Sequence, residues 1–599
     1  MMRAPSLLAL AALLPACSRR PDVVLITLDT ARADRFGCLG GPADLTPAVD
    51  ALAREGVLFP DTEVTAPITL PSHASMLTGL YPDGHRVRDN SPDPLPSDVP
   101  TLAEALRARG WRTAAFVSGD PLHRRFGLAR GFEVYDDAVD RPRSRQRGYL
   151  RERRGDRTVE QAARWLQTAR GAVFLWVHLF DPHAPYEPPE PFASRFPGDP
   201  YAGELAFTDE CVGRLFRSLR DCGRGDAVVA VLTDHGEGLG DHGEKTHQFL
   251  LQDSTARGLF LLRAPGRLPA GRVARGAVSP CDLLPTLLRI VDVAPIEPVD
   301  GHDLGADLER GMPADRAACS ETLAGLFHHD WAPLRAVRQG SWRLVEGGGE
   351  ARLFDLSRDP GETADRSQEE PGRVRALGSL LRPLRSRSAA PRADDPRRAP
   401  PGYAQGAPTA TILARGPEEL ARLPSPAARL EVVEALEAAQ VRLFAEQAAP
   451  ARKALGTLAE REPRSPTVRF YLGSACRDDG RGDEERDPEK AQRSYEEALG
   501  HFSAVLERRP GHPGALNLSL WCLHKLGRFE EGRALAQAAV DDRRGDGDTH
   551  FWLGAFFSTV GAPFYDLARA ERAALRALEL DPTSVHARKL LQDLRGRRP

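Results

Sequence analysis

Two uninterrupted apolar stretches, each followed by an acid, constrain the fold of this chain more than any other feature. Residues 22–28 precede Asp29, and residues 227–233 precede Asp234 and His235. A strand that is apolar on both faces is typical of a parallel sheet buried between two layers of helices. The carboxyl ends of such strands gather the residues that follow them at one edge of the sheet. The two runs therefore predict a buried parallel sheet with Asp29, Asp234 and His235 at that edge.

Further strand-like runs alternate with helical stretches over the first half of the chain. Apolar runs typical of strands occupy 113–117, 173–178 and 258–262, and helical periodicity marks 101–109 and 157–168. Strands that alternate with helices form a mainly parallel sheet with helices on both faces. We therefore expect an α/β domain. Two later segments, 336–346 and 350–356, flank three glycines and predict a hairpin.

The composition changes after this domain. Residues 386–410 are rich in Pro, Arg, Ser and Gly and show no periodicity, which is typical of a linker. Residues 411–599 are rich in Ala and helical in pattern. The sequence therefore predicts an α/β domain over about residues 20–385, a linker, and an all-α domain.

Motifs in the helical part are similar to those of tetratricopeptide repeats. Tyr471-Leu472-Gly473 and Trp552-Leu553-Gly554 show the same pattern, and Pro510 and Pro582 lie 72 residues apart, close to two periods of about 34 residues. A charged insertion at 477–488 accounts for a longer first interval. A solenoid of such repeats is the favoured interpretation, and a generic helical bundle is the alternative.

The segment 66–79 is predicted to place a hydroxyl group at the start of a helix. Thr69 stands just before Pro71, the expected first residue of the helix, and Gly79 marks its end. The backbone N–H groups and the positive dipole end of a helix favour an anionic group there. Thr69 is therefore placed to attack a sulfate or phosphate ester.

These segments together resemble the sulfatase family of the alkaline phosphatase superfamily. The motifs that carry the resemblance, in family order, are the strand ending at Asp29, residues 46–50 with 56–59, the Pro71–Ser72 helix ending in Leu77-Thr78-Gly79, and Asp-His-Gly-Glu at 234–237. The resemblance covers roughly residues 20–385. It implies a mainly parallel sheet sandwiched by helices, with a small antiparallel C-terminal subdomain.

The resemblance also implies a divalent cation at the edge of the sheet. By match to the family motifs its ligands are Asp29, Asp234 and His235, with the hydroxyl oxygen of Thr69 completing the set. Two carboxylates with one imidazole suit calcium, magnesium or manganese. Coordination to a cation lowers the pKa of a bound hydroxyl group, which a threonine nucleophile needs.

Three histidines are candidates for substrate binding. His183 lies in a Pro-His-x-Pro loop, which implies contact with an ester oxygen, while His247 and His73 stand near family positions that carry cationic side chains. If Asp181, His183 and His247 all turned inward, they would allow a second cation, which would be zinc. The sequence leaves one cation or two open.

The departures from the family pattern bear on the chemistry. Sulfatases of the main type oxidise a Cys or Ser to formylglycine, whereas Thr69 is a secondary alcohol and would give a ketone. His73 replaces the expected arginine, and Thr30 replaces an expected acid. The favoured function is a metal-dependent hydrolase of a sulfate or phosphate ester with Thr69 as nucleophile. The alternatives are a phosphoester transferase, a strict sulfatase, and a non-catalytic scaffold whose repeats bind a protein.

The N-terminus predicts export. Arg3 precedes a mostly apolar run, Ala4 to Ala16, and a small residue stands before Cys17, which is similar to a bacterial lipoprotein signal. Residues 1–17 are therefore expected to be a signal, with Cys17 as a lipid anchor in the membrane of the cell envelope, facing the periplasm or the exterior. A plain export signal, or a start of the chain that is assigned too early, is the alternative.

The charge and the repeats limit the partners. A formal net charge of −3 gives no reason to expect nucleic acid. The expected substrate is a small-molecule, glycan or lipid ester. The repeats are expected to bind a protein or peptide.

Overall fold

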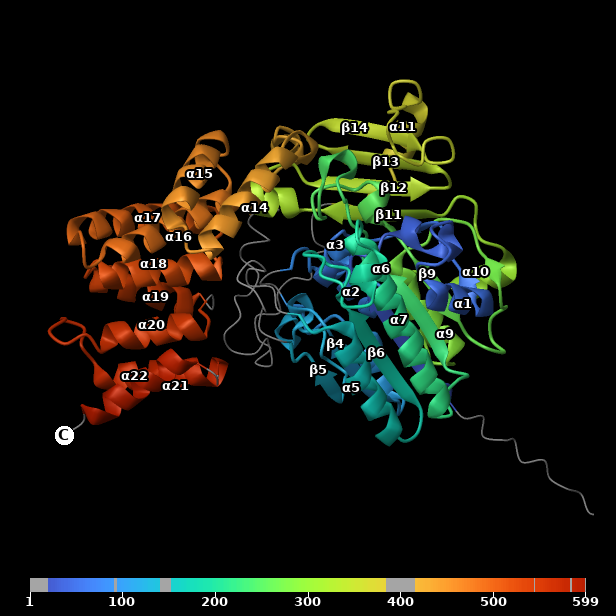
Figure 1. Cartoon of the computed structure of the whole chain (residues 1–599), viewed down its shortest axis with the longest axis horizontal. Helices are drawn as coiled ribbons and strands as arrows, with labels where there is room; N and C mark the ends of the chain where they lie inside the picture. The colour runs from blue at the N-terminus through green and yellow to red at the C-terminus, as the bar shows by residue number, and fades with distance from the viewer. Residues whose placement is uncertain are drawn as a thin grey trace, which may run out of the picture.

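The structure, a computed structural model, describes residues 20–90, 94–139, 152–383, 415–542, 545–581 and 584–597. Figure 1 shows an α/β domain with a small antiparallel sheet at one end and a stack of helices at its side. The predicted signal at residues 1–17 and the predicted linker at 386–410 lie outside the described residues.

An eight-stranded sheet forms the centre of the α/β domain, in the order β10-β2-β9-β7-β1-β6-β4-β5. Its strands are β1 (Val23–Leu28), β2 (Val57–Leu58), β4 (Arg112–Val117), β5 (Val134–Asp136), β6 (Val173–Leu179), β7 (Val228–Thr233), β9 (Phe260–Arg263) and β10 (Arg272–Val273). The central strand β1 runs parallel to both neighbours, β6 and β7. The predicted mainly parallel sheet is therefore confirmed.

Strand β9 reverses direction within this sheet. It pairs antiparallel with β7 on one side and with β2 on the other. A parallel neighbour would need a crossover connection, whereas an antiparallel one does not. The chain therefore leaves the sheet at the end of β7, passes through residues 234–259 and re-enters the sheet as β9 from the same end of the strands.

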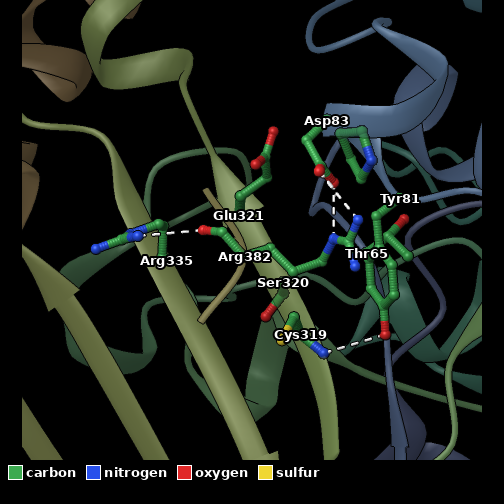
Figure 2. Close-up of a pocket in the computed structure, with 9 residues that line it drawn as sticks. Thr65, Tyr81, Asp83, Cys319, Ser320, Glu321, Arg335 and Arg382 are labelled. Carbon is green, nitrogen blue, oxygen red and sulfur yellow. Dashed lines mark hydrogen bonds and ion pairs between the residues drawn. The ribbon is translucent and has the colours of Figure 1, made fainter. Parts of the chain in front are cut away.

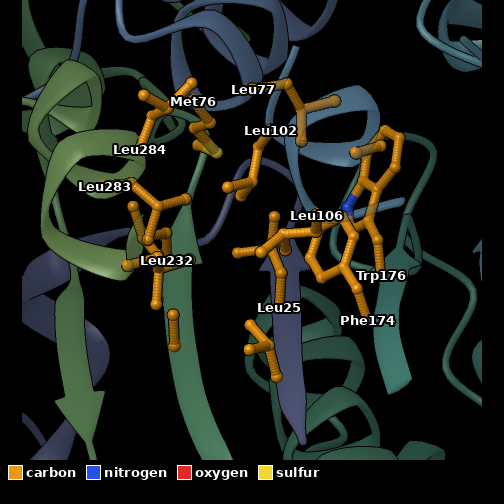
Figure 3. Close-up of a cluster of buried hydrophobic side chains, with 14 of the residues drawn as sticks. Leu25, Met76, Leu77, Leu102, Leu106, Phe174, Trp176, Leu232, Leu283 and Leu284 are labelled. Atoms are coloured by element: carbon orange, nitrogen blue, oxygen red, sulfur yellow. The ribbon is translucent and has the colours of Figure 1, made fainter. Parts of the chain in front are cut away.

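Helices cover both faces of the sheet because successive strand residues point to opposite sides. One face carries α2 (Thr69–Thr78), α4 (Leu102–Ala108) and α9 (Leu283–Ile290), and the other carries α1 (Pro47–Glu55), α5 (Gly155–Thr168) and α7 (Pro200–Asp221). Figure 3 shows Leu25, Trp176 and Leu232 meeting the first set of helices. Each fully buried Leu or Phe contributes about 1.5–3 kcal/mol to stability.

Shorter elements complete this domain. They are α3 (Pro82–His85), α6 (Phe192–Arg195), α8 (Asp253–Ala256), α10 (Leu304–Arg310), α11 (Pro371–Gly378), a π-helix η8 (Gly325–His329) and a two-stranded pair of β3 (Thr62–Glu63) with β8 (Arg257–Gly258).

The second sheet is antiparallel and has four strands, β11 (Ala317–Thr322), β12 (Leu334–Gln339), β13 (Trp342–Gly347) and β14 (Glu350–Asp355). The predicted hairpin was wrong in one respect, because its first segment, 336–346, contains two strands rather than one. Gly340, with φ 59°, turns the chain between β12 and β13. A left-handed residue at a tight turn is the conformation that glycine favours.

A polar cavity of about 10 Å³ lies between β11 and α3 (Figure 2), large enough for roughly one water molecule. The Arg382 guanidinium donates to both carboxylate oxygens of Asp83, at 2.7 and 2.9 Å. The Cys319 amide donates to the Tyr81 hydroxyl at 3.3 Å. These contacts join the antiparallel sheet to the helix that follows α2.

The helical domain comprises α14 (Leu430–Phe444), α15 (Ala448–Arg461), α16 (Pro466–Asp483), α17 (Pro488–Arg508), α18 (Pro513–Lys525), α19 (Phe529–Asp541), α20 (Gly547–Phe557), α21 (Leu567–Leu580) and α22 (Val585–Gly596), and a short α13 (Pro417–Ala421) precedes it. Each helix from α14 packs on the next. The predicted insertion at 477–488 is largely helical, because α16 continues to Asp483. None of the helices in the described ranges has the length and apolarity that a membrane span requires.

The two domains share a buried apolar cluster. Ile68, Phe249, Ala324 and Trp331 of the α/β domain belong to the same cluster as residues of α14 to α18. Polar contacts flank it: the Trp331 indole N–H donates to Glu462 at 3.0 Å, and Lys245 pairs with Glu434 at 2.6 Å. The helical domain is therefore packed against the α/β domain rather than only tethered to it.

Candidate active site

The carboxyl ends of two neighbouring strands bring Asp29, Asp234 and His235 together. Asp29 follows β1, and Asp234 follows β7, whose last residue pairs with the last residue of β1. One ligand atom from each of the three residues lies within 4.8 Å of the other two, and all three residues are buried. The arrangement is the one that the sequence predicted for the edge of the sheet.

Backbone hydrogen bonds fix the carboxylate of Asp234. Its Oδ1 accepts the amide N–H of Thr30 at 3.2 Å and that of His235 at 2.8 Å. The hydroxyl group of Ser72 in α2 donates to the Asp234 carbonyl oxygen at 2.7 Å. The other carboxylate oxygen, Oδ2, has no hydrogen-bond partner. Asp234 therefore keeps one buried oxygen for another ligand.

The neighbouring atoms are also unpartnered. Both carboxylate oxygens of Asp29 and Nε2 of His235 are buried without a hydrogen bond. Nδ1 of His235 lies 3.0 Å from the Gly236 carbonyl oxygen, so Nδ1 carries the proton and Nε2 keeps its lone pair. Buried carboxylate oxygens without donors are costly unless they bind a cation. The donor set fits a divalent ion that prefers oxygen ligands.

The pKa shifts of these three residues also indicate that the site favours a positive charge. Burial raises the pKa of Asp29, and burial together with the charge of Asp29 raises the pKa of Asp234 to about 6. Burial alone would lower the pKa of His235, but the carboxylates of Asp234 and Asp29 outweigh it and raise that pKa.

Thr69 is the first residue of α2 and is almost fully buried. The helix begins two residues earlier than predicted, so Pro71 is its third residue rather than its first. Proline is tolerated anywhere in a first turn, because the N–H groups there have no partner within the helix. The contact of Ser72 with Asp234 ties this turn of the helix to the carboxylate cluster.

His73 is fully buried one turn after Thr69. Its Nδ1 donates to the Thr69 carbonyl oxygen at 2.8 Å and lies 3.7 Å from Oδ2 of Asp234. Burial lowers its pKa to about 3. The ring is therefore neutral at physiological pH, and its unpartnered Nε2 presents a lone pair rather than the positive charge of the arginine that the family pattern expects.

His183 and His247 lie beside the carboxylate cluster. The His247 ring is 4.5 Å from that of His235 and 5.2 Å from that of His183, between ring centroids. His183 stacks on Phe180 at 4.4 Å. Nδ1 of His247 lies 3.1 Å from a carboxylate oxygen of Glu237, whose pKa burial raises to about 7.

Asp181 does not join these histidines as a ligand. Its Oδ1 accepts the amide N–H of Gly155, the first residue of α5, at 3.0 Å. The carboxylate therefore holds the start of that helix, which is the role that acids favour at helix N-termini. Its Oδ2 is buried without a hydrogen-bond partner. Among the described residues, Asp181, His183 and His247 do not form a group whose ligand atoms lie within 4.8 Å of one another, which corrects the expectation that the three could together hold a second cation.

Two contributors to the site were not singled out in the sequence. Nε2 of His178 lies 3.4 Å from Oδ2 of Asp29, and its Nδ1 lies 3.1 Å from the Thr27 hydroxyl group. Oδ1 of Asn90 accepts the Leu70 amide N–H at 2.8 Å, next to Thr69. His178 was visible as the last polar residue of a strand-like run, whereas Asn90 lies in a loop without a pattern.

Known protein families match both parts of the chain. The sulfatase family model matches residues 21–293, and a tetratricopeptide repeat model matches residues 436–491 and 489–548. An ulvan-active sulfatase of Formosa agariphila is 26% identical, over 57% of this chain and 76% of that protein. Human arylsulfatase A is 28% identical, over 59% and 85%. A multifunctional alkaline phosphatase superfamily protein of Trinickia caryophylli is 26% identical, over 49% and 78%.

Solved structures share the fold of the α/β domain. A phosphonate monoester hydrolase of Agrobacterium radiobacter aligns with a TM-score of 0.50 and 22% identity, over 60% of this chain and 94% of that one. The protein Ps i-CgsB, in complex with k-i-k-neocarrahexaose, aligns with a TM-score of 0.52 and 21% identity, over 60% and 92%.

Proposed function

Because residues 21–293 form a sulfatase-family domain that is followed by tetratricopeptide repeats, we propose that this chain is a metal-dependent hydrolase of sulfuric or phosphoric esters with Thr69 as its nucleophile. Asp29, Asp234 and His235 would hold the cation, together with the Thr69 hydroxyl oxygen. The observation that carries the proposal is the set of buried, unpartnered oxygen and nitrogen atoms on these three residues. A scaffold that had lost catalysis would have no reason to keep them.

The cation itself is proposed to be calcium, magnesium or manganese. Carboxylate and hydroxyl oxygens suit these hard ions, and a single imidazole is compatible with them. When bound, the ion lowers the pKa of a coordinated hydroxyl group and offsets negative charge on the ester. Zinc is the alternative if a second ion binds near His183 and His247.

Thr69 supplies the nucleophile in this proposal. Its oxygen forms a bond to sulfur or phosphorus while the bond to the alcohol oxygen breaks, and the alcohol leaves with the proton that the Thr69 hydroxyl group gives up. Water then attacks the sulfur or phosphorus atom, releases sulfate or phosphate and restores the Thr69 hydroxyl group. A second alcohol in place of water would make the protein a transferase.

His183 is assigned to an ester oxygen. Its Nδ1 lies 2.6 Å from the Ala184 carbonyl oxygen, so the proton on Nδ1 is committed and contact with an anionic oxygen requires a second proton on Nε2. Burial lowers the pKa of His183, while Asp29 and Glu237 oppose this shift. A bound anion would also raise the pKa of His183, because it stabilises the protonated ring as Asp29 and Glu237 do. His247 and His73 are the further substrate contacts that we propose. Because Nδ1 of His73 donates to the Thr69 carbonyl oxygen, its Nε2 would contact the substrate as a hydrogen-bond acceptor.

The location of the protein, the class of its substrate and the partner of its repeats are also proposals. Cleavage before Cys17 and lipidation of its thiol would anchor the protein to the cell envelope, facing the periplasm or the exterior. The substrate would then be an ester on a small molecule, glycan or lipid of that compartment. The repeats would bind a protein or peptide, and no part of the proposal involves nucleic acid.

Steady-state assays on the purified protein test the proposal. Aryl sulfate, phosphate and phosphonate esters are offered with and without divalent cations. We expect turnover only with a cation, and Thr69→Ala to lower kcat by at least about 10³-fold. Thr69→Ser, which retains a hydroxyl group, serves as the matched control and should keep most activity. An alanine variant as active as the wild type would exclude Thr69 as the nucleophile.

A further inference from the structure

The contacts between the two domains point to the helical domain as part of the catalytic unit. We propose that Arg509, in the turn between α17 and α18, is a positioning residue that fixes the first turn of α2, and with it Thr69, through Asp89 and Asn90. The inference rests on the proposed role of Thr69 and assigns to the repeats a function besides partner binding.

The start of α2 is held on its apolar side by the shared cluster. Ile68 immediately precedes Thr69, stands at the N-cap position of α2 and is 1% exposed. It belongs to the same buried cluster as Val432 and Leu436 of α14. The residue next to the nucleophile is therefore packed in a core that the α/β domain cannot complete alone.

A polar chain holds the same turn from the other side. The backbone N–H of Leu70 donates to the side-chain Oδ1 of Asn90 at 2.8 Å, and the backbone N–H of Asn90 donates to Oδ1 of Asp89 at 2.8 Å. Oδ2 of Asp89 lies 3.2 Å from Nε2 of His328 and 3.8 Å from the Arg509 guanidinium. These consecutive contacts connect the helical domain to the residue after Thr69.

The π-helix η8 lies between the domains at this point. The Arg509 guanidinium donates to the Phe327 carbonyl oxygen at 3.3 Å, and the Ser465 hydroxyl group donates to the His328 carbonyl oxygen at 3.2 Å. Nδ1 of His329 lies 3.0 Å from the same hydroxyl oxygen. Single-turn π-helices are rare and occur frequently at functional sites. This one is fastened to the helical domain along its length.

The charges in this chain of contacts are buried and interdependent. Burial alone would raise the pKa of Asp89, but His328 and Arg509 outweigh it and hold that pKa below its ordinary value. Asp89 is 6% exposed and Arg509 is 8% exposed. Removing the buried guanidinium leaves His328 as the remaining ion-pair partner of Asp89 among the described residues and takes away part of the compensation of that carboxylate. Loss of Arg509 should therefore release Asp89, then Asn90, and then the amide that Asn90 holds.

Arg509→Met in the full-length protein tests the inference, with Arg528→Met as the matched control. Arg528 pairs with Glu531 and Glu496 inside the helical domain. We expect Arg509→Met to lower kcat by roughly ten- to a hundredfold, to leave cation affinity by titration calorimetry within about twofold, and to change KM less than kcat. Arg509→Lys, which keeps the charge, should recover part of the loss.

Hydrogen–deuterium exchange gives a readout that does not depend on turnover. Amides in peptides covering residues 66–79 should exchange roughly tenfold faster in Arg509→Met than in Arg528→Met, with β7 unchanged. Faster exchange there in a protein that hydrolyses no ester would uphold the positioning and reject the proposed function. Unchanged exchange at 66–79, or an equal increase in β7, would overturn the inference.

Discussion

The buried carboxylates at this edge of the sheet differ in their hydrogen-bond partners, and therefore in their roles. Asp29 and Asp234 have unpartnered buried oxygens that face a common centre. Asp181, although close to His183 in the sequence, accepts the Gly155 amide and has one buried oxygen without a partner. Burial raises the pKa of Asp181 from 3.8 to about 7. Its protonation state therefore depends on pH in the neutral range.

This shift predicts a pH-dependent stability. A folded-state pKa above the unfolded value of 3.8 means that the folded protein holds the proton more tightly. The stabilising contribution is complete below pH 3.8 and is lost as the pH rises through about 7. Asp181→Asn removes the titration and keeps an oxygen for the Gly155 amide.

The comparison is made by thermal unfolding of both proteins at pH 5 and pH 8. The melting temperature of Asp181→Asn relative to the wild type should be higher at pH 8 than at pH 5, by roughly 2–6 °C. An identical difference at both values would show that the carboxyl group does not titrate in this window.

At this scale the sequence predicted the residues that follow strands. Asp29, Asp234 and His235 come together because β1 and β7 are apolar, buried and adjacent. The roles of His178 and Asn90 were missed, because each depends on one neighbour brought close by folding. Nothing in a Pro-rich loop indicates that one carboxylate oxygen of Asp181 would accept the amide at the start of α5.

The helix α2 shows how a single element positions the site. Its start carries Thr69, and Gly79 ends it with φ 70°, a left-handed conformation that only glycine adopts at low cost. A Cβ atom on Gly79 would also lie 2.6 Å from a methyl group of Val299. Both the backbone and the packing at this end require glycine.

Gly79→Ala should therefore destabilise the protein more than the same substitution at a glycine that has a left-handed conformation but no close neighbour. Gly171 has φ 77°, and a Cβ atom added there would meet no atom beyond its chain neighbours within 4 Å. Gly171→Ala should cost about 1–2 kcal/mol, and Gly79→Ala about 1–3 kcal/mol more. Denaturant unfolding of both variants measures the difference, and equal losses would refute the packing argument.

Elements whose ends are marked by glycine or by the end of an apolar run were predicted well. The apolar runs gave β1, β6 and β7 to within one or two residues, and Gly79 gave the end of α2. The turn between β12 and β13 was missed because a single Gly340 carries it, whereas three consecutive glycines mark the next turn. The beginning of α2 was misplaced because proline fits several positions of a first turn.

The whole molecule is more than two domains on one chain, because their cores merge. Trp331 is fully buried, donates to Glu462 and stacks on His329 with centroids 4.2 Å apart. Domains that share a large apolar interface unfold together rather than independently. The sequence revealed both domains but not their contact, since Ile68, Phe249 and Trp331 are scattered and follow no period.

Scanning calorimetry of the full chain should show one main unfolding transition. Trp331→Ala creates a cavity that costs about 3–5 kcal/mol and should split this transition or lower it clearly. Trp552→Ala, in the half-buried part of α20, is the control and should not uncouple the domains. Two separate transitions in the wild type would show that the shared cluster does not couple them.

The reversed direction of β9 sets where this architecture tolerates change. The chain returns to the sheet from the end at which β7 leaves it, so the connection needs no crossover over a face of the sheet and contains the short α8 as its only α-helix. Its exposed turn, Asp241–Gly243, is thus a natural point for grafting. Loops of other lengths inserted after Asp241, which pairs with Arg32 at 2.8 Å, would project from the segment that carries Asp234, His235 and His247, which makes this turn the place to diversify a library aimed at new substrates.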